Sequence, residues 1–129
     1  PILILRNNKV IGILDWELST LGHPIADFSY HCLSWRTQEA FWDEAKLKEL
    51  GIPSEKEYME MYCKYSGKDL SKNWEFYMAF NMFKIAGILQ GILGRVRDGT
   101  AASKHAEERG NMVFPLSQAA WETIEDNFL

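Results

Sequence analysis

The sequence lacks several features that would each indicate a class of function. Its 14 lysine and arginine residues are outnumbered by 18 aspartate and glutamate residues, and the basic residues are scattered without forming a block. Proteins that bind DNA or RNA gather basic side chains into a patch or stripe. We therefore expect no nucleic-acid partner.

Cysteine is scarce. The two cysteines, Cys32 and Cys63, lie far apart, lack CxxC spacing and sit in apolar, helix-like surroundings. A free thiol in such surroundings behaves as a small hydrophobic side chain. This pattern excludes a disulfide framework of closely spaced cysteines and favours a reducing, cytoplasmic setting.

Uninterrupted apolar runs are also missing. The most apolar window, FYMAFNMFKIAGILQGILGRV, contains Asn81, Lys84, Gln90 and Arg95. A lone lipid-spanning helix would expose these polar groups to hydrocarbon. We therefore interpret the window as a buried helix of a soluble domain and expect no membrane partner.

The N-terminus has neither an initial methionine nor the charged, apolar and small-residue regions of a signal peptide. The chain opens at Pro1 directly with PILIL, which already has the pattern of a strand. We expect that a segment upstream of Pro1 has been lost. No internal repeat, low-complexity tract or linker is visible.

What is present suits one folded unit. The 129 residues are 47% hydrophobic and 13% aromatic, which is enough for a core of ordinary size. Apolar runs over residues 2–5 and 10–14, separated by RNNK, predict a β-hairpin because paired asparagines tolerate turn geometry. Pro24 predicts the first position of a helix that runs to about Trp35, with Asp27 in its first turn.

The remainder predicts a helical bundle, so the fold class is α+β and mainly helical. The expected helices are a weak one over residues 39–50 ended by Gly51 and Pro53, one opened by a Ser54–Glu57 capping box and running to about Tyr65, a long one over residues 72–97 capped by Ser71, and two segments, 100–110 and 115–128, broken near Gly110 and Pro115.

The long helix is apolar on nearly all sides, which places it at the centre of the fold. Gly87, Gly91 and Gly94 share one face of it. Glycine in a helix interior costs about 1 kcal/mol relative to alanine. We therefore expect the backbone of a neighbouring element to approach this face closely.

Carboxylates follow the second strand directly. If the chain stays extended through Asp15, Trp16 and Glu17, both acids point to one side and Trp16 to the other. Two convergent carboxylates suit a hard cation such as Mg²⁺. The alternative is that the acids only end a strand and accept hydrogen bonds from turn N–H groups.

The longer stretch GILDWELSTLGHPIADF resembles the aminoglycoside phosphotransferase family of kinase-like enzymes. The residues that carry this resemblance are Asp15, Trp16, Glu17, Gly22, Pro24, Asp27 and Phe28, in the family's order and spacing. The stretches MAFNMFKIAGILQGILGRVRDGTAAS and PLSQAAWE are similar to the phosphotransferase-type domain fused to some acyl-CoA dehydrogenases. The resemblance covers nearly the whole chain.

The resemblance implies the C-terminal lobe of a kinase-like fold, with residues 1–129 as a single partial domain. It implies that Asp15 holds Mg²⁺ against the phosphates of ATP, and that Glu17 supports or binds the metal. It also implies that Asp27 braces the catalytic loop by accepting backbone hydrogen bonds. The simpler reading of Asp27 is an acid stabilised by a helix N-terminus. His23 stands where the family favours an acid, and we interpret it as an exposed turn residue.

The family's catalytic loop, His-Gly-Asp followed by a metal-binding Asn, does not occur in this sequence, and neither does the nucleotide-binding lobe with its lysine. The resemblance implies that this loop, with the catalytic base, lies upstream of Pro1. It therefore implies part of a small-molecule phosphotransferase, with no catalytic residue in this chain and no activity on its own. The alternative is a non-catalytic binding or assembly module on a kinase-like scaffold. A carboxylate–metal hydrolase would need further ligands, for which His31 and His105 are candidates by default.

Two expectations concern partners. A missing lobe would leave apolar surface exposed on the hairpin and the long helix, which predicts a homodimer, with pairing of the hairpin edge as one route. The phosphate acceptor is expected to be a hydroxylated small molecule bound by the later helices. Their aromatic and methionine residues, more often core than pocket, are Tyr58, Met59, Met61, Tyr62, Trp74, Tyr77 and Met78.

Overall fold

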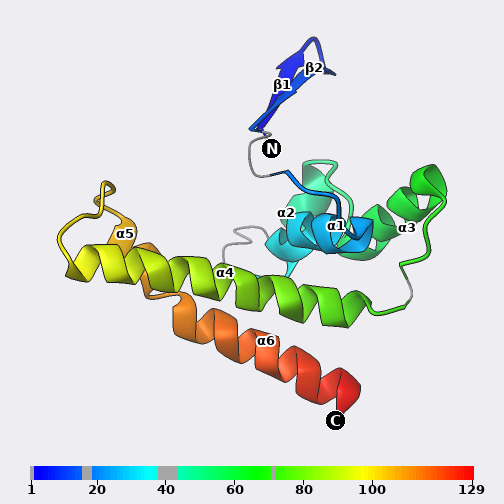
Figure 1. Ribbon diagram of the computed structural model, residues 1–129. Helices are drawn as coiled ribbons and strands as arrows, with labels where there is room; N and C mark the ends of the chain where they lie inside the picture. The colour runs from blue at the N-terminus through cyan, green and yellow to red at the C-terminus, as the bar shows by residue number, and fades with distance from the viewer. Residues whose placement is uncertain (1, 16–18, 38–43, 71) are drawn as a thin grey trace.

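The computed structural model describes residues 2–15, 19–37, 44–70 and 72–129. It is mainly helical with one antiparallel hairpin, which confirms the predicted fold class (Figure 1). The elements in chain order are β1 (Ile2–Arg6), β2 (Lys9–Leu14), α1 (Pro24–Cys32), the 3-10 helix η1 (Leu33–Trp35), α2 (Glu44–Glu49), α3 (Glu55–Ser66), α4 (Trp74–Arg97), α5 (Ala106–Gly110) and α6 (Val113–Phe128).

The hairpin forms where the sequence predicted it. Its first strand begins at Ile2, while Pro1 lies outside the described residues. Asn7 and Asn8 both adopt left-handed backbone angles, with φ of 51° and 58°, as a tight hairpin turn requires. Figure 1 shows the hairpin standing away from the helices, with its turn pointing outward. Many of its apolar side chains are therefore exposed, on both strands.

The starts of α1 and α3 follow their local sequence signals. Nδ1 of His23 accepts a hydrogen bond from the N–H of Ile25 at 3.3 Å, and Pro24 is the first helical residue. Ser54 and Glu57 form the predicted capping box at the start of α3. Helix α1 ends at Cys32 and passes directly into η1, so the predicted helical stretch does reach Trp35.

Helix α4 lies at the centre of the bundle. Helix α6 runs along one side of it and α1 packs on another (Figure 1). The buried apolar cluster around α4 consists of Ile25, Phe28, Cys32, Leu33, Leu70, Trp74, Met78, Met82, Ala86, Leu116 and Ala120. The buried amide of Asn81 donates to the Ala26 carbonyl at 2.9 Å and to the Ser29 hydroxyl at 2.8 Å, which fixes α1 against α4.

Helix α4 is long and apolar enough to cross a membrane by length and composition alone, with a mean hydropathy of 1.3 over its most apolar window. Core helices of soluble proteins pass the same test. Here α4 packs against α1, α5 and α6 and hydrogen-bonds to α1 through Asn81. Part of its apolar surface is therefore packed within the helical bundle, while 28% of that window is buried and the rest is not.

Helix α4 confirms the long helix predicted over about residues 72–97: it begins at Trp74, after Asn73 with its left-handed φ of 64°, and Ser71 lies outside the described residues. The expected contact at its glycines is wrong. No described element approaches the glycine face: a Cβ built on Gly87, Gly91 or Gly94 would have no other atom within 4 Å. The glycines face open space because α1 and α6 pack on the other sides of the helix.

The last part of the chain differs from its prediction in detail. Only Ala106–Gly110 of the expected helix over residues 100–110 is helical. The break near Gly110 is confirmed, but Pro115 is no break, because it lies in the first turn of α6, where its missing N–H costs no hydrogen bond. The weak signal over residues 39–50 corresponds to α2, and residues 38–43 lie outside the described part.

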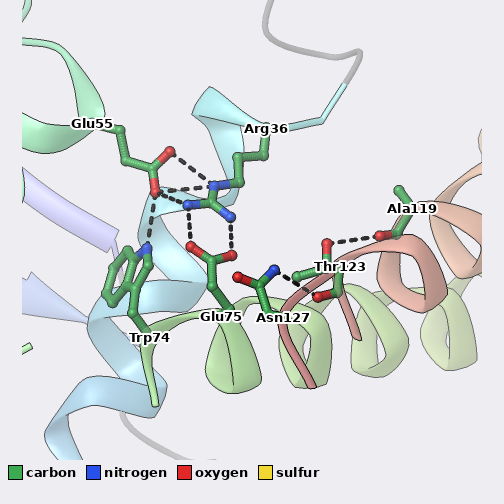
Figure 2. Close-up of polar contacts among 7 residues, drawn as sticks. All are labelled: Arg36, Glu55, Trp74, Glu75, Ala119, Thr123 and Asn127. Carbon is green, nitrogen blue, oxygen red and sulfur yellow. Dashed lines mark hydrogen bonds and ion pairs between the residues drawn. The ribbon is translucent and has the colours of Figure 1, made fainter. Parts of the chain in front are cut away.

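A polar network joins the helix ends (Figure 2). The guanidinium of Arg36 pairs with the carboxylates of Glu55 on α3 and Glu75 on α4, and Nε1 of Trp74 donates to Glu55 at 2.9 Å. Burial alone would lower the pKa of Arg36, but the hydrogen bonds to Glu75 and Glu55 outweigh it and raise that pKa. Arg36 therefore stays charged and ties three helices together.

Candidate functional site

Asp15 lies at the end of β2 with an exposed side chain. Its backbone is left-handed, with φ of 70°, a conformation that few residues other than glycine, asparagine and aspartate adopt. The chain therefore turns at Asp15, and the expectation that it stays extended through the acidic triplet is wrong at this residue. Trp16 and Glu17 lie outside the described residues, so the predicted role of Glu17 stays a prediction.

Asp27 lies in the first turn of α1, as predicted, and it is exposed. The free N–H groups and the dipole of this helix end favour a carboxylate there. It makes no hydrogen bond or ion pair with another described residue. The loop that Asp27 would brace is absent from this sequence, so its bracing role stays a prediction.

The expected position of the catalytic base also stays a prediction. The resemblance places that base upstream of Pro1, and Pro1 itself lies outside the described residues. The described structure begins at Ile2 on β1, the first strand of the hairpin.

A cavity of about 890 Å³ opens beside Asp27. Its lining is largely apolar and aromatic, with a few polar groups at the α1 side and one arginine from α5. The lining residues are Leu3, Pro24, Asp27, Phe28, Tyr30, His31, Leu33, Ser34, Thr37, Tyr58, Tyr62, Ile85, Leu89, Arg109, Met112 and Leu116. Asp15 is not among them, so the structure does not bring the two predicted acids into one cavity.

Stacked aromatic rings shape the cavity wall. The ring of Phe28 stacks on Tyr62 with a centroid distance of 3.9 Å, and Tyr58 stacks on Trp35 at 5.3 Å. Burial, and then the charge that the Cys32 thiol carries when it ionises, raise the pKa of Tyr58. The Tyr58 hydroxyl therefore keeps its proton at neutral pH and remains a hydrogen-bond donor.

The predicted aromatic and methionine set divides between core and cavity. Trp74 and Met78 are buried in the core, as expected for most of the set. Tyr58 and Tyr62 pack against that core and also line the cavity. Met61 is exposed beside α2, away from both.

Each of the three histidines contacts a helix end, an aromatic ring or a carboxylate. His23 caps α1, and its ring stacks on Tyr77 with a centroid distance of 5.2 Å, so this exposed turn residue is also held in place. The His31 ring packs near Trp35 and Tyr58. His105 lies with Nδ1 3.4 Å from a Glu108 oxygen, just before α5. Within the described ranges, no three His, Cys, Asp or Glu side chains come together as metal ligands.

Sequence reasoning missed Arg36 and its carboxylate partners. Glu55 and Glu75 are 19 and 39 residues away from Arg36. Side-chain spacing within one helix predicts contacts only between residues three or four apart. Each glutamate taken alone has the pattern of an ordinary acid in a first helical turn. Arg109, a cationic group of the cavity, was missed for the same reason.

Burial also perturbs one thiol near this network. Cys32 is fully buried, and burial raises the pKa of its thiol to about 12, with the Glu55 carboxylate adding to the rise and Arg36 opposing it. The thiol therefore stays protonated at neutral pH and lacks nucleophilic character. The predicted role of Cys32 as a small hydrophobic side chain is confirmed.

Comparison with known proteins gives concordant results. The sequence model of the Phosphotransferase enzyme family matches residues 2–62. Acyl-CoA dehydrogenase family member 10 from Mus musculus is 40% identical over 119 residues, covering 88% of this chain and 11% of that protein. Acyl-CoA dehydrogenase family member 11 from Homo sapiens is 35% identical over 124 residues, covering 93% of this chain and 16% of that protein. The chain thus spans a small part of these relatives' length.

A solved structure has the same fold. It is a protein from Ralstonia eutropha JMP134 provisionally assigned as an aminoglycoside phosphotransferase, with a TM-score of 0.84 and 44% sequence identity. The match covers 96% of this chain and 39% of that one. The resemblance seen in the sequence is thereby confirmed: residues 2–62 match the phosphotransferase enzyme family, and the chain has the fold of one part of a kinase-like phosphotransferase.

Proposed function

We propose that the chain is part of an ATP- and Mg²⁺-dependent phosphotransferase that transfers the γ-phosphoryl group to a hydroxylated small molecule. In this proposal Asp15, with Glu17, forms the metal side of the site, and Asp27 braces the catalytic loop. The acid that accepts the proton of the acceptor hydroxyl is supplied from upstream of Pro1. The setting is cytoplasmic, without nucleic-acid or membrane partners.

The observation that carries the proposal is the spaced acidic motif within the family match. Asp15 and Asp27 keep the family's spacing inside residues 2–62, which match the family. The left-handed backbone of Asp15 turns the chain at the strand end, where its carboxylate is exposed. Backbone angles of this kind in a residue other than glycine are concentrated at functional sites.

The donor set fits a magnesium ion. Mg²⁺ prefers oxygen ligands and is usually held by one or two protein carboxylates, with water and substrate phosphates completing its shell. Asp15 offers one exposed carboxylate. A bound Mg²⁺ would neutralise charge on the nucleotide phosphates, and the part of Asp15 is to hold the ion at the strand end.

The cavity beside Asp27 supports an apolar acceptor. Aromatic and aliphatic side chains line most of it, and its polar groups are few, as in pockets for apolar small molecules. Asp27 is the only acid in its wall among the described residues, which gives a polycationic aminoglycoside little to pair with. The names of the longer relatives, acyl-CoA dehydrogenase family members, agree with an acceptor that carries an acyl-type chain.

A second candidate function is a non-catalytic assembly module on the same scaffold. The observation in its favour is the amount of exposed apolar surface on β1, β2 and α4. This candidate requires no Mg²⁺ affinity at Asp15, which separates it from the first.

Metal titration of the 129-residue chain tests the proposal directly. We expect Mn²⁺, used as a paramagnetic substitute for Mg²⁺, to broaden the NMR signals of residues 12–14 selectively. The Asp15→Asn variant should lose this effect and keep its fold, because asparagine also tolerates left-handed backbone angles. Broadening that persists unchanged in Asp15→Asn would contradict the role of Asp15.

Activity of the same chain gives a second readout. We expect no phosphoryl transfer from ATP to hydroxylated acceptors, because the sequence holds no His-Gly-Asp loop to supply a base. Turnover that Asp15→Asn abolishes would show that the chain carries its own catalytic groups and would overturn the proposed division of the site.

Asp27→Asn is the matched control for the metal titration. This variant should leave the Mn²⁺ effect intact.

A further inference from the structure

The outward face of α4 is apolar and has no partner among the described residues. It consists of Phe76, Phe80, Phe83, Gly87, Gly91 and Gly94, which fall within an arc of about 80° at 3.6 residues per turn. We call these six residues the α4 face. Phe83 is 71% exposed, and Phe76 and Phe80 are each 48% exposed. None of the six residues is charged.

The two halves of the α4 face differ in shape: the first protrudes and the second is recessed. Its first half carries three phenylalanine rings, of which Phe76 and Phe80 stack with centroids 6.4 Å apart. Its second half carries three glycines, and no atom of another described element lies within 4 Å of a Cβ built on any of them. A ridge of rings is therefore followed along the same line by a recess in the helix surface.

We propose that the α4 face binds a second copy of this chain, with the two α4 helices antiparallel about a two-fold axis near residue 85. This pairing sets Phe76 opposite the second copy's Gly94. It also sets Phe80 opposite Gly91 and Phe83 opposite Gly87. Each ring ridge then fills the glycine recess of the other copy, as an interface with two-fold symmetry requires.

The charges beside the face permit this pairing. Lys84 borders the face near the proposed axis, where two ammonium groups would repel each other. Its Nζ lies 5.1 Å from the centroid of the Tyr30 ring on α1, so the ammonium is held at the side of the bundle. The antiparallel arrangement also sets opposite ends of the two helix dipoles side by side.

The exposed area of the α4 face determines how strongly we expect two copies to dimerise. The exposed parts of the three rings amount to roughly 330 Å² per copy, taking about 200 Å² for a whole phenylalanine side chain. A stable interface of standard size buries about 800 Å² per partner. We therefore expect a reversible dimer that forms at micromolar concentration, rather than a permanent one.

Sedimentation velocity over a concentration series tests the pairing. The unmodified chain should pass from monomer to dimer, and Phe83→Glu should raise the dissociation constant at least tenfold because it places two carboxylates near the axis. Phe114→Glu is the matched control, since Phe114 is 75% exposed on α6 and lies off the α4 face. A monomer at every concentration, or an equal effect of both variants, would overturn the proposal.

A second variant tests the pairing independently, in case Phe83→Glu does not fold. Gly87→Ala with Gly91→Ala fills the recess with methyl groups that meet nothing in the monomer. This double variant should fold at least as stably as the unmodified chain and yet dimerise several-fold more weakly. Unchanged dimerisation of a folded double variant would show that the recess takes no part and would overturn the proposed pairing.

Cross-linking determines the direction of the helices. In a background that carries Cys63→Ser, a short bis-maleimide should link two copies of Phe83→Cys, which lie close to the axis. Two copies of Phe76→Cys should not be linked, because they are about 18 residues apart in register, or about 27 Å at 1.5 Å per residue. Linkage of Phe76→Cys as efficient as that of Phe83→Cys would indicate a parallel pair and overturn the proposed geometry.

Discussion

At the scale of single residues, burial decides which groups have unusual chemistry. Cys32 has no exposed surface, while Asp15 and Asp27 are open to solvent. The sequence predicted Cys32 as a small hydrophobic side chain and Asp15 and Asp27 as acids of one motif. Packing adds the degree of burial, which holds the Cys32 thiol protonated in the core and leaves both carboxylates exposed.

The buried thiol predicts a fall in stability at alkaline pH. Burial raises the pKa of Cys32 to about 12, whereas a thiol in the unfolded chain ionises near pH 8.5. Between these values only the unfolded state loses the proton, so rising pH favours unfolding by about 1.4 kcal/mol per pH unit. Urea unfolding at pH 7.5 and pH 10.5 should show a loss of about 3 kcal/mol that Cys32→Ala lacks.

Titrating groups that do not interact with Cys32 contribute equally to both proteins, so the comparison isolates Cys32 and the coupled Tyr58 hydroxyl. The matched control is Cys63→Ala, which removes a half-buried thiol on α3 and should keep the pH dependence of the unmodified chain. An identical pH dependence in Cys32→Ala and the unmodified chain would show that the folded state does not hold this proton.

At the scale of elements, local signals predicted helix starts better than helix neighbours. The capping box at Ser54 and the proline at the start of α1 are each complete within a few residues, and both are confirmed. The glycines of α4 were interpreted as a contact with a neighbouring element, which is wrong. Which side of a uniformly apolar helix meets a neighbour depends on tertiary packing, and periodicity does not contain that information.

Open space beside these glycines predicts a stabilising substitution. Gly87→Ala should raise the free energy of unfolding of the monomer by about 0.5–1 kcal/mol, because alanine has the higher helix propensity and its methyl group meets no other atom. Thermal unfolding at concentrations well below dimerisation measures this change.

Gly110→Ala provides the contrasting control. A Cβ at Gly110 would overlap the Leu93 side chain on α4, so this variant should be less stable than the unmodified chain. Opposite signs for the two glycines would confirm the packing of α4. Destabilisation by Gly87→Ala would indicate that an element does cover the α4 face in solution.

At the scale of the whole molecule, the hairpin and the helical bundle depend little on each other. The buried core cluster begins at Ile25 and contains no described residue of β1 or β2. Figure 1 shows the hairpin projecting from the bundle, and Leu3 is its contribution to the cavity wall. The metal side of the proposed site therefore lies at the end of a hairpin outside the core, and the acceptor side lies on the bundle.

Removal of the hairpin should leave the bundle folded. We expect a chain that lacks residues 1–14 to keep its helical circular dichroism and a cooperative thermal transition within a few degrees of the unmodified chain. The shortened chain should also lose the Leu3 side of the cavity. Loss of the cooperative transition would show that the hairpin supports the core.

The sequence by itself determined the family resemblance, the hairpin, the starts of α1 and α3 and the two acids of the motif, because each depends on residues near one another along the chain. Only the tertiary structure decided that Asp27 borders a cavity without Asp15, and that Arg36 joins Glu55 and Glu75. It also decided that one side of α4 stays open. These features depend on contacts between distant residues, and local spacing does not encode such contacts.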